Sequence, residues 1–103
     1  MTDRHVELHS EAFEEAERAL FWYRERSPRA AESFLIEFHR VLDRIAETPH
    51  LWPKAAGGWR RYPFLGFPFF VVYQELRNSI FVVAVAHGRR KPGYWRSRIV
   101  PQG

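Results

Sequence analysis

The spacing of hydrophobic positions changes near residue 10, from alternation to a helical repeat. Val6 and Leu8 alternate with polar neighbours, which predicts a short half-buried strand over residues 4–9. Beyond this point apolar side chains recur every three or four positions, which predicts a helix over residues 11–26. Ser10 stands at the expected N-cap, with acidic residues in the first turns, where they favour the helix dipole. The predicted apolar stripe consists of Phe13, Ala16, Leu20 and Tyr23.

A second helix is predicted to follow almost immediately. Ser27 and Pro28 suit the end of one helix and the start of the next, with serine as N-cap and proline at the first helical position. The stripe that follows ends at Thr48 and Pro49. With so short a connection, the two helices should form an antiparallel hairpin whose aromatic side chains lie in the core. The stripe contains Ala31, Phe34, Leu35, Phe38, Val41, Leu42 and Ile45.

The second half of the chain is predicted to form strands. Residues 48–58 hold two prolines and two glycines, so we expect a loop there. Strands are predicted over 59–64, 69–76 and 80–87, and their short connections indicate an antiparallel meander. The prediction is therefore an α+β fold in a single domain, residues 1–103. It consists of an N-terminal strand, a helix hairpin packed on one face of the sheet, the meander and a short basic C-terminal tail.

Composition restricts the class of protein. An apolar content of 46%, with 17% aromatic residues, excludes a disordered chain. The absence of cysteine excludes disulfides and thiolate metal sites, and no apolar run is long enough to cross a membrane, so we expect a cytoplasmic protein without membrane contact. His5, Glu7 and His9 share one face of the first strand and could bind a metal, but alternate spacing on an edge strand is a weak signal. We therefore expect no metal and no other cofactor.

Charge is divided unevenly between the two halves. Residues 1–53 contain seven arginines and eleven acids, whereas residues 54–103 contain nine lysines and arginines and one acid, Glu75. The first half therefore has a formal charge of −4 and the second of +8. A basic face built by the second half is suited to phosphates or to an acidic protein.

The most distinctive sequence begins where the last predicted strand ends. Ala84-Val85-Ala86-His87 is followed by Arg90-Lys91-Pro92-Gly93-Tyr94-Trp95 and is preceded by the basic and aromatic stretch from Arg60 to Tyr73. With the order of elements, these motifs resemble the RelE/ParE superfamily, the toxins of bacterial type II toxin-antitoxin modules, which include plasmid stabilisation proteins. The resemblance implies a growth-arresting toxin in a hetero-oligomer with its cognate antitoxin. It also implies one of two targets, messenger RNA on the ribosome or DNA gyrase.

An RNA-cleaving toxin would need a proton acceptor, a proton donor and cations around the phosphate. His87 is the best-matched general base because its reference pKa lies near neutrality. Tyr94, Arg61 and Arg90 would complete the catalytic set. The alternative for His87 is a structural role, in which it hydrogen-bonds the backbone of the tail. Whether the protein is an enzyme stays open at this point.

A gyrase inhibitor would need no catalytic residues, and the strand ending at His87 is closer to ParE-like members, which favours this branch. Its target-binding residues would be Arg60, Arg89, Lys91, Trp95, Arg96 and Arg98. Strand alternation sends Arg60 and Arg61 to opposite faces, so only one of the two is expected to touch a target. Tyr94 and Trp95 could instead pack as a lid over the sheet. A further alternative is a non-toxic nucleic-acid-binding module that stacks single strands on its tail.

The antitoxin is expected to contribute an acidic or amphipathic segment that lies across the basic surface. Trp22, Ile36 and His39 are predicted on the outer faces of the two helices. Two of these side chains are apolar on otherwise polar faces, so all three are candidate antitoxin contacts.

Overall fold

The computed structural model describes residues 4–101. Its α+β class and its order of elements confirm the sequence prediction. The helices and strands are β1 (His5–Leu8), α1 (Ser10–Arg26), α2 (Pro28–Glu47), β2 (Arg60–Pro63), β3 (Phe69–Glu75), β4 (Ser79–His87) and the short 3₁₀ helix η1 (Arg96–Arg98).

The four strands form one mixed sheet in the order β1-β4-β3-β2. The strands β2, β3 and β4 make the predicted antiparallel meander, whereas β1 pairs in parallel with β4. The pairing with β1 covers only Ser79–Val82, so the later residues of β4 extend past the end of β1. This uncovered stretch of the β4 edge is where α1 and the tail meet the sheet, through hydrogen bonds of Glu15 and Arg98.

The two helices form the predicted hairpin, and Ser27 joins them. Its backbone N–H donates to the Tyr23 carbonyl at 2.7 Å, which ends α1, and its hydroxyl accepts from the Ala30 N–H at 3.2 Å, which caps α2. The expected N-cap of α1 is wrong by one residue. The cap is His9, whose Nδ1 accepts from the Glu11 N–H at 3.0 Å, because Ser10 already has helical geometry.

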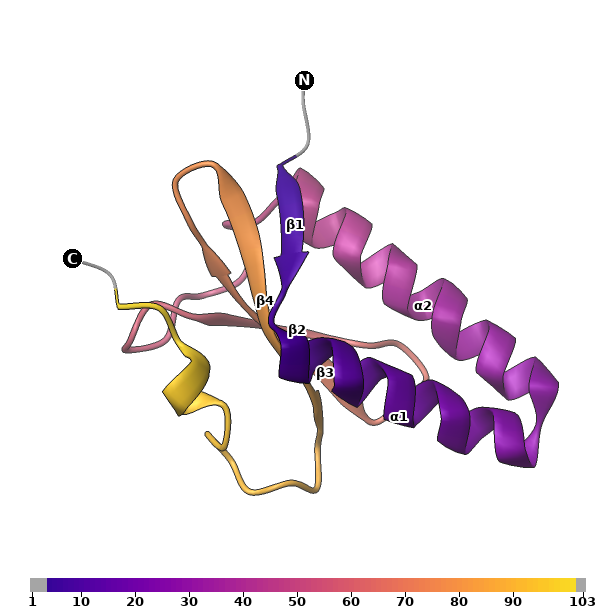
Figure 1. The fold of residues 1–103 in the computed structure, drawn as a ribbon. Coiled ribbons are helices and arrows are strands. Elements are labelled where there is room, and N and C mark those ends of the chain that lie inside the picture. The colour runs from indigo at the N-terminus through magenta and orange to yellow at the C-terminus, as the bar shows by residue number, and fades with distance from the viewer. Residues whose placement is uncertain (1–3, 102–103) are drawn as a thin grey trace.

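Each face of the sheet is covered by a different part of the chain, with the helices on one side and the C-terminal tail on the other (Figure 1). We call these the helix face and the tail face. The helix face holds the larger core, in which Phe34 stacks against Tyr23 and Phe64 with ring centroids 5.4 Å apart. The tail face holds a smaller cluster centred on Trp95.

The predicted core position of Phe13 is wrong, since this side chain is 53% exposed. Leu35, the other misplaced member of the predicted stripes, is also exposed. The buried face of α1 is instead lined by Ala12, Ala16 and Ala19. Small side chains let α1 pack close to β4, and this turns Phe13 outward.

Candidate functional site

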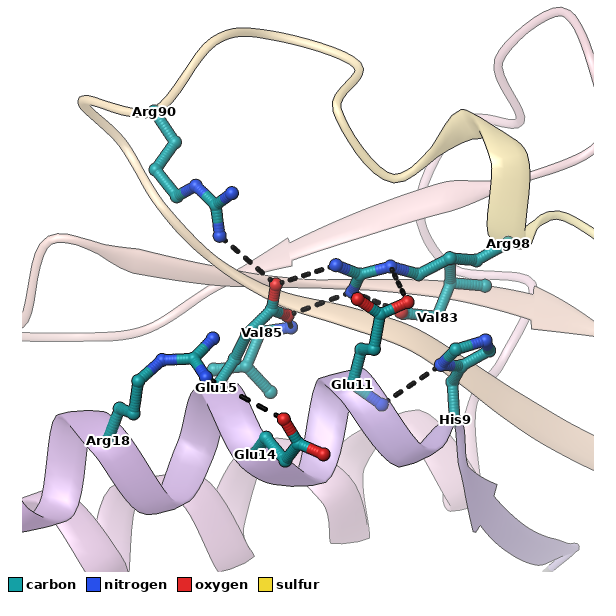
Figure 2. Close-up of polar contacts among 9 residues, drawn as sticks. All are labelled: His9, Glu11, Glu14, Glu15, Arg18, Val83, Val85, Arg90 and Arg98. Carbon is teal, nitrogen blue, oxygen red and sulfur yellow. Dashed lines mark hydrogen bonds and ion pairs between the residues drawn. The ribbon is translucent and has the colours of Figure 1, made fainter.

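A buried carboxylate holds the tail against α1 and β4 (Figure 2). The Glu15 side chain on α1 is 4% exposed, and its Oε1 accepts from the Val85 N–H at 2.9 Å. Arg98 Nη2 approaches Glu15 Oε2 at 3.0 Å, and Arg90 Nη1 reaches the same oxygen at 3.3 Å. We call these four residues the Glu15 clasp.

Arg98 is the more deeply buried cation of the clasp. Its Nη1 also donates to the Val83 carbonyl at 3.2 Å, and its Nε lies 3.5 Å from Glu11 Oε2. Burial disfavours the charge, but the Glu15 carboxylate overcomes that cost, and the pKa of Arg98 is raised. Together Glu15 and Arg98 bond backbone groups of β4 beyond the end of β1, a position where a strand edge needs partners.

Tyr94 and Trp95 pack on the tail face, as the lid alternative predicted. The Trp95 ring lies edge-on to Trp59 at 5.4 Å and to Phe70 at 5.7 Å, and Trp95 is only 2% exposed. Tyr94 lies under the Arg90 guanidinium, 3.7 Å from its ring centroid. Burial, and then the nearby Glu15 carboxylate, raise the pKa of Tyr94. In this conformation Trp95 has no surface with which to contact a target.

The side chains of the adjacent residues Arg60 and Arg61 point to opposite faces of the sheet, as strand alternation predicted. Arg60 donates to the Trp52 carbonyl at 2.6 Å and lies 3.6 Å from Glu75 Oε1, with a side chain only 13% exposed. The Arg61 guanidinium lies over the Phe70 ring on the tail face, 4.3 Å from the ring centroid. Arg61 is therefore the exposed member of the pair.

The structure does not bring the four predicted nuclease residues together. His87 pairs across the sheet with Phe69, on the helix face, and the two rings meet edge-on at 5.0 Å. Arg61 pairs with Val72 on the tail face, and cross-strand partners point to the same side of a sheet. The His87 Nδ1 accepts from the Arg89 N–H at 3.0 Å, which is the structural role left open above.

His87 also lines a groove of about 370 Å³ between α1 and the uncovered end of β4. Glu15, Tyr23 and Arg90 line the same groove. The groove therefore brings His87 near Arg90 of the predicted catalytic set, and leaves Arg61 on the far side of the sheet.

Three predicted target-binding cations stay exposed, namely Arg89, Lys91 and Arg96, which we call the free basic residues. No carboxylate within residues 4–101 pairs with any of them. They lie on the loop after β4 and at the start of η1. Gly93 shapes this loop with φ of +79°, and a Cβ there would lie 2.6 Å from the Arg96 Nε, so only glycine fits without displacing that side chain.

The helix hairpin exposes apolar side chains on its outer surface. Trp22 is 51% and Ile36 64% exposed, and His39 is also exposed, as the sequence predicted. The Arg26 guanidinium lies over the Trp22 ring at 3.8 Å and bonds the Trp22 carbonyl, which holds the indole in place. Phe21, 59% exposed, adds an apolar group that sequence reasoning missed.

Sequence reasoning also missed Glu15, although a signal for it exists. Glu15 lies three residues after Ala12 and four before Ala19, so it belongs to the small, apolar face of α1. An acid on such a face requires a buried partner, and the longest run of cations after the helices, Arg89 to Lys91, lies in the tail.

Two further observations concern metals and membranes. Within residues 4–101, no group of three or more His, Cys, Asp or Glu side chains is arranged to hold a metal ion. His5 lies 3.7 Å from Glu7, and His9 is occupied in capping α1. Among the helices of the same residues, none is long and apolar enough to cross a membrane.

The fold and site define a small α+β protein that carries a helix hairpin on one sheet face and a basic, clasped tail on the other. Residues 6–92 match the family model of the ParE toxin of the type II toxin-antitoxin system, parDE, so the chain belongs to the ParE toxin family. This confirms the resemblance drawn from the sequence and its closer relation to ParE-like members. A search of curated proteins found no match.

The fold is also found in a solved structure described as a chromosomal ParDE toxin-antitoxin system from P. aeruginosa. The TM-score is 0.64 at 11% sequence identity, and the match covers 82% of this chain and 95% of that chain. At this identity the likeness concerns the fold alone.

Proposed function

We propose that this ParE-family toxin arrests growth by binding and inhibiting DNA gyrase in the cytoplasm, and that a cognate antitoxin neutralises it. Target binding is assigned to the free basic residues Arg89, Lys91 and Arg96. This mode of action needs no catalytic group and no cofactor. Arg60, Trp95 and Arg98 are removed from the target-binding set, because their side chains are buried and engaged within the fold.

The observation that carries this choice is the placement of His87 and Arg61 on opposite faces of the sheet. General acid–base cleavage needs the base within hydrogen-bond reach of the reacting group, with cations at the same phosphate. Binding has no such requirement, and exposed, unpaired cations serve it directly. The arrangement therefore favours inhibition by binding over messenger RNA cleavage.

The test compares gyrase supercoiling with ribosome-dependent messenger cleavage in the same preparation. We expect inhibition of supercoiling without cleavage. Combined substitution Arg89→Ala, Lys91→Ala and Arg96→Ala should raise the half-inhibitory concentration on the order of 100-fold, as expected when three interfacial charges each contribute about 1 kcal/mol. The matched control is Arg24→Ala, Arg29→Ala and Arg77→Ala, which removes three exposed cations elsewhere. Messenger cleavage without gyrase inhibition, or equal loss in both triple variants, would contradict the proposal.

The antitoxin is proposed to cover the outer surface of the helix hairpin at Trp22, Ile36 and His39, with an acidic or amphipathic segment. Exposed apolar side chains on a well-packed scaffold are the usual anchors of such contacts. Substituting Trp22→Glu with Ile36→Glu should weaken the complex roughly 100-fold, in line with loss of about 2–4 kcal/mol of anchor contacts. Calorimetric titration with the cognate antitoxin measures this effect.

A matched control for the antitoxin test is Leu51→Glu with Leu65→Glu. These two apolar side chains are 56% and 67% exposed, and they lie outside the helices, in the loops that follow α2 and β2. Circular dichroism should show both double variants folded. Equal weakening by both double variants would mean that the loss of any exposed apolar side chain weakens the complex. This result would contradict the proposal that the antitoxin binds the hairpin surface.

A further inference from the structure

A second groove, away from the Glu15 clasp, runs along β2 and the loop before it. Its volume is about 450 Å³, within the range of clefts that hold small ligands or parts of larger ones. Trp52, Lys54, Trp59, Arg61 and Phe70 line it. None of its lining side chains belongs to the free basic residues or to the helix hairpin surface.

The cations of this groove differ from those of the clasp. Lys54 and Arg61 are exposed, and neither has a carboxylate partner in the described part of the chain. Arg60 also lines the groove, but its guanidinium is engaged within the fold, where it donates to the Trp52 carbonyl and lies 3.6 Å from Glu75, a carboxylate that it shares with Arg4. The groove therefore holds two positive charges that no carboxylate within residues 4–101 neutralises, and these are complementary to phosphate.

Aromatic side chains present flat ring surfaces beside these two charges. The Arg61 guanidinium lies over Phe70, with its carbon 4.3 Å from the ring centroid, and Phe70 packs edge-on against the buried Trp95. Trp59 also packs edge-on against Trp95, at an interplanar angle of 83°. Guanidinium planes and anchored aromatic rings are the surfaces on which unpaired bases stack. Because Trp95 already anchors these rings, little side-chain freedom is lost on binding.

We propose that this groove binds single-stranded nucleic acid, with phosphates at Lys54 and Arg61 and a base against the Arg61–Phe70 stack or Trp59. Alternation of cation and aromatic surface matches the alternation of phosphate and base along a strand. An acidic peptide would bind only to the two cations and would leave the aromatic surfaces unused. A duplex, whose bases stay stacked inside, would likewise use only its phosphates. The proposal goes beyond gyrase inhibition and does not depend on it.

The test is fluorescence anisotropy of the full-length protein with a labelled oligo(dT) strand of about ten nucleotides, a length within the range of known single-strand sites. We expect Arg61→Ala to weaken binding about tenfold and to lower the slope of log K against log salt by about 0.7, since one phosphate contact is lost. Lys54→Ala should lower the slope by the same amount. Arg61→Lys should keep the slope but lose affinity, because the charge remains and the stacking plane is gone.

The matched control is Arg77→Ala, which removes one exposed cation at the turn between β3 and β4, beyond the opposite end of β3 from Phe70. It should leave both affinity and slope close to those of the unchanged protein. Equal effects of Arg61→Ala and Arg77→Ala would reduce the binding to net charge and overturn the proposal. Loss of binding only in the variant lacking Arg89, Lys91 and Arg96 would overturn it too, because the oligonucleotide would then bind the tail and not the groove.

A competition experiment distinguishes a single strand from the other candidate ligands. Unlabelled oligo(dT) should displace the probe at much lower concentration than thymidine monophosphate, duplex DNA or poly-glutamate. If any of these three competes as well as the strand, the groove is not a single-strand site. Loss of oligonucleotide binding with gyrase inhibition intact would overturn this inference alone, and the reverse result would overturn only the proposed function.

Discussion

Two buried carboxylates, one on each helix, show how differently the same chemistry is used in this protein. Glu15 on α1 and Glu37 on α2 are 5% and 9% exposed. Each accepts a backbone N–H from outside its helix, Glu15 from Val85 at 2.9 Å and Glu37 from Leu65 at 2.6 Å. Both thereby fasten a helix to the chain that follows the hairpin.

The difference lies in where their cations come from. Glu37 is bonded by Arg40 of the same helix, with contacts of 2.7 and 2.8 Å, and the Arg40 side chain is 36% exposed. Glu15 is bonded by Arg90 and Arg98, which follow it by 75 and 83 positions, and the Arg98 side chain is only 8% exposed. One carboxylate is thus satisfied locally, whereas the other determines where the tail lies.

This difference has a functional consequence. The free basic residues lie between or beside the two arginines that Glu15 holds, so the clasp positions the surface proposed to bind gyrase. Glu37 positions only the turn after β2. Loss of one carboxylate or the other should therefore have different effects on the stability of the fold and on the position of the tail.

The largest effect is expected for Glu15→Gln. The amide keeps the shape of the side chain but leaves the buried Arg98 with only the exposed Glu11 carboxylate, 3.5 Å from its Nε, which should cost about 3 kcal/mol of unfolding free energy. Urea denaturation measures the loss. Trypsin should also cut after Arg90 and Arg98 faster in the variant, because the tail opens before the sheet does.

Glu14→Gln is the matched control for this substitution. Glu14 is the preceding residue on α1, its side chain is 60% exposed, and its contact with Arg18 is 3.8 Å long. Loss of such a surface pair should change stability by less than about 0.5 kcal/mol. A stable Glu15→Gln protein with an unchanged tail would show that Trp95 packing alone fixes the tail. This result would contradict the view that Glu15, unlike Glu37, determines where the tail lies.

The helix hairpin was predictable because its signals are local. Ser27 and Pro28 set the junction through bonds to Tyr23 and Ala30, all within four residues. The predicted stripe of α2 contains every buried residue of this helix except Glu37 and Ala46, although it also includes the exposed Leu35. The prediction failed for Phe13, because the narrow contact of α1 with β4 selects alanines over the larger side chain.

The tail was predictable in composition and not in arrangement. Its cations look alike in the sequence, yet Arg98 is buried against Glu15 while Arg96 is exposed. The partner of Arg98 lies in the first helix, and no local pattern links the two. The orientation of Arg60 and Arg61 was readable from alternation, but the bond from Arg60 to the Trp52 carbonyl was not. Parallel pairing of β1 with β4 is likewise a long-range contact.

The smaller effect is expected for Glu37→Gln, and it depends on pH. The hydrogen bonds from Arg40, more than any other cause, lower the pKa of Glu37 below its ordinary value. A depressed folded-state pKa stabilises the fold above the unfolded-state pKa, and this stabilisation is lost as pH falls through the folded-state pKa. At pH 7 the substitution should cost about 1–2 kcal/mol, less than Glu15→Gln because the half-exposed Arg40 can turn to water. Urea unfolding from pH 7 down to about 3, below the reference pKa of a glutamate, should show the gap between the two proteins closing. A gap of constant size would mean that shape, and not ionisation, accounts for the contribution of Glu37.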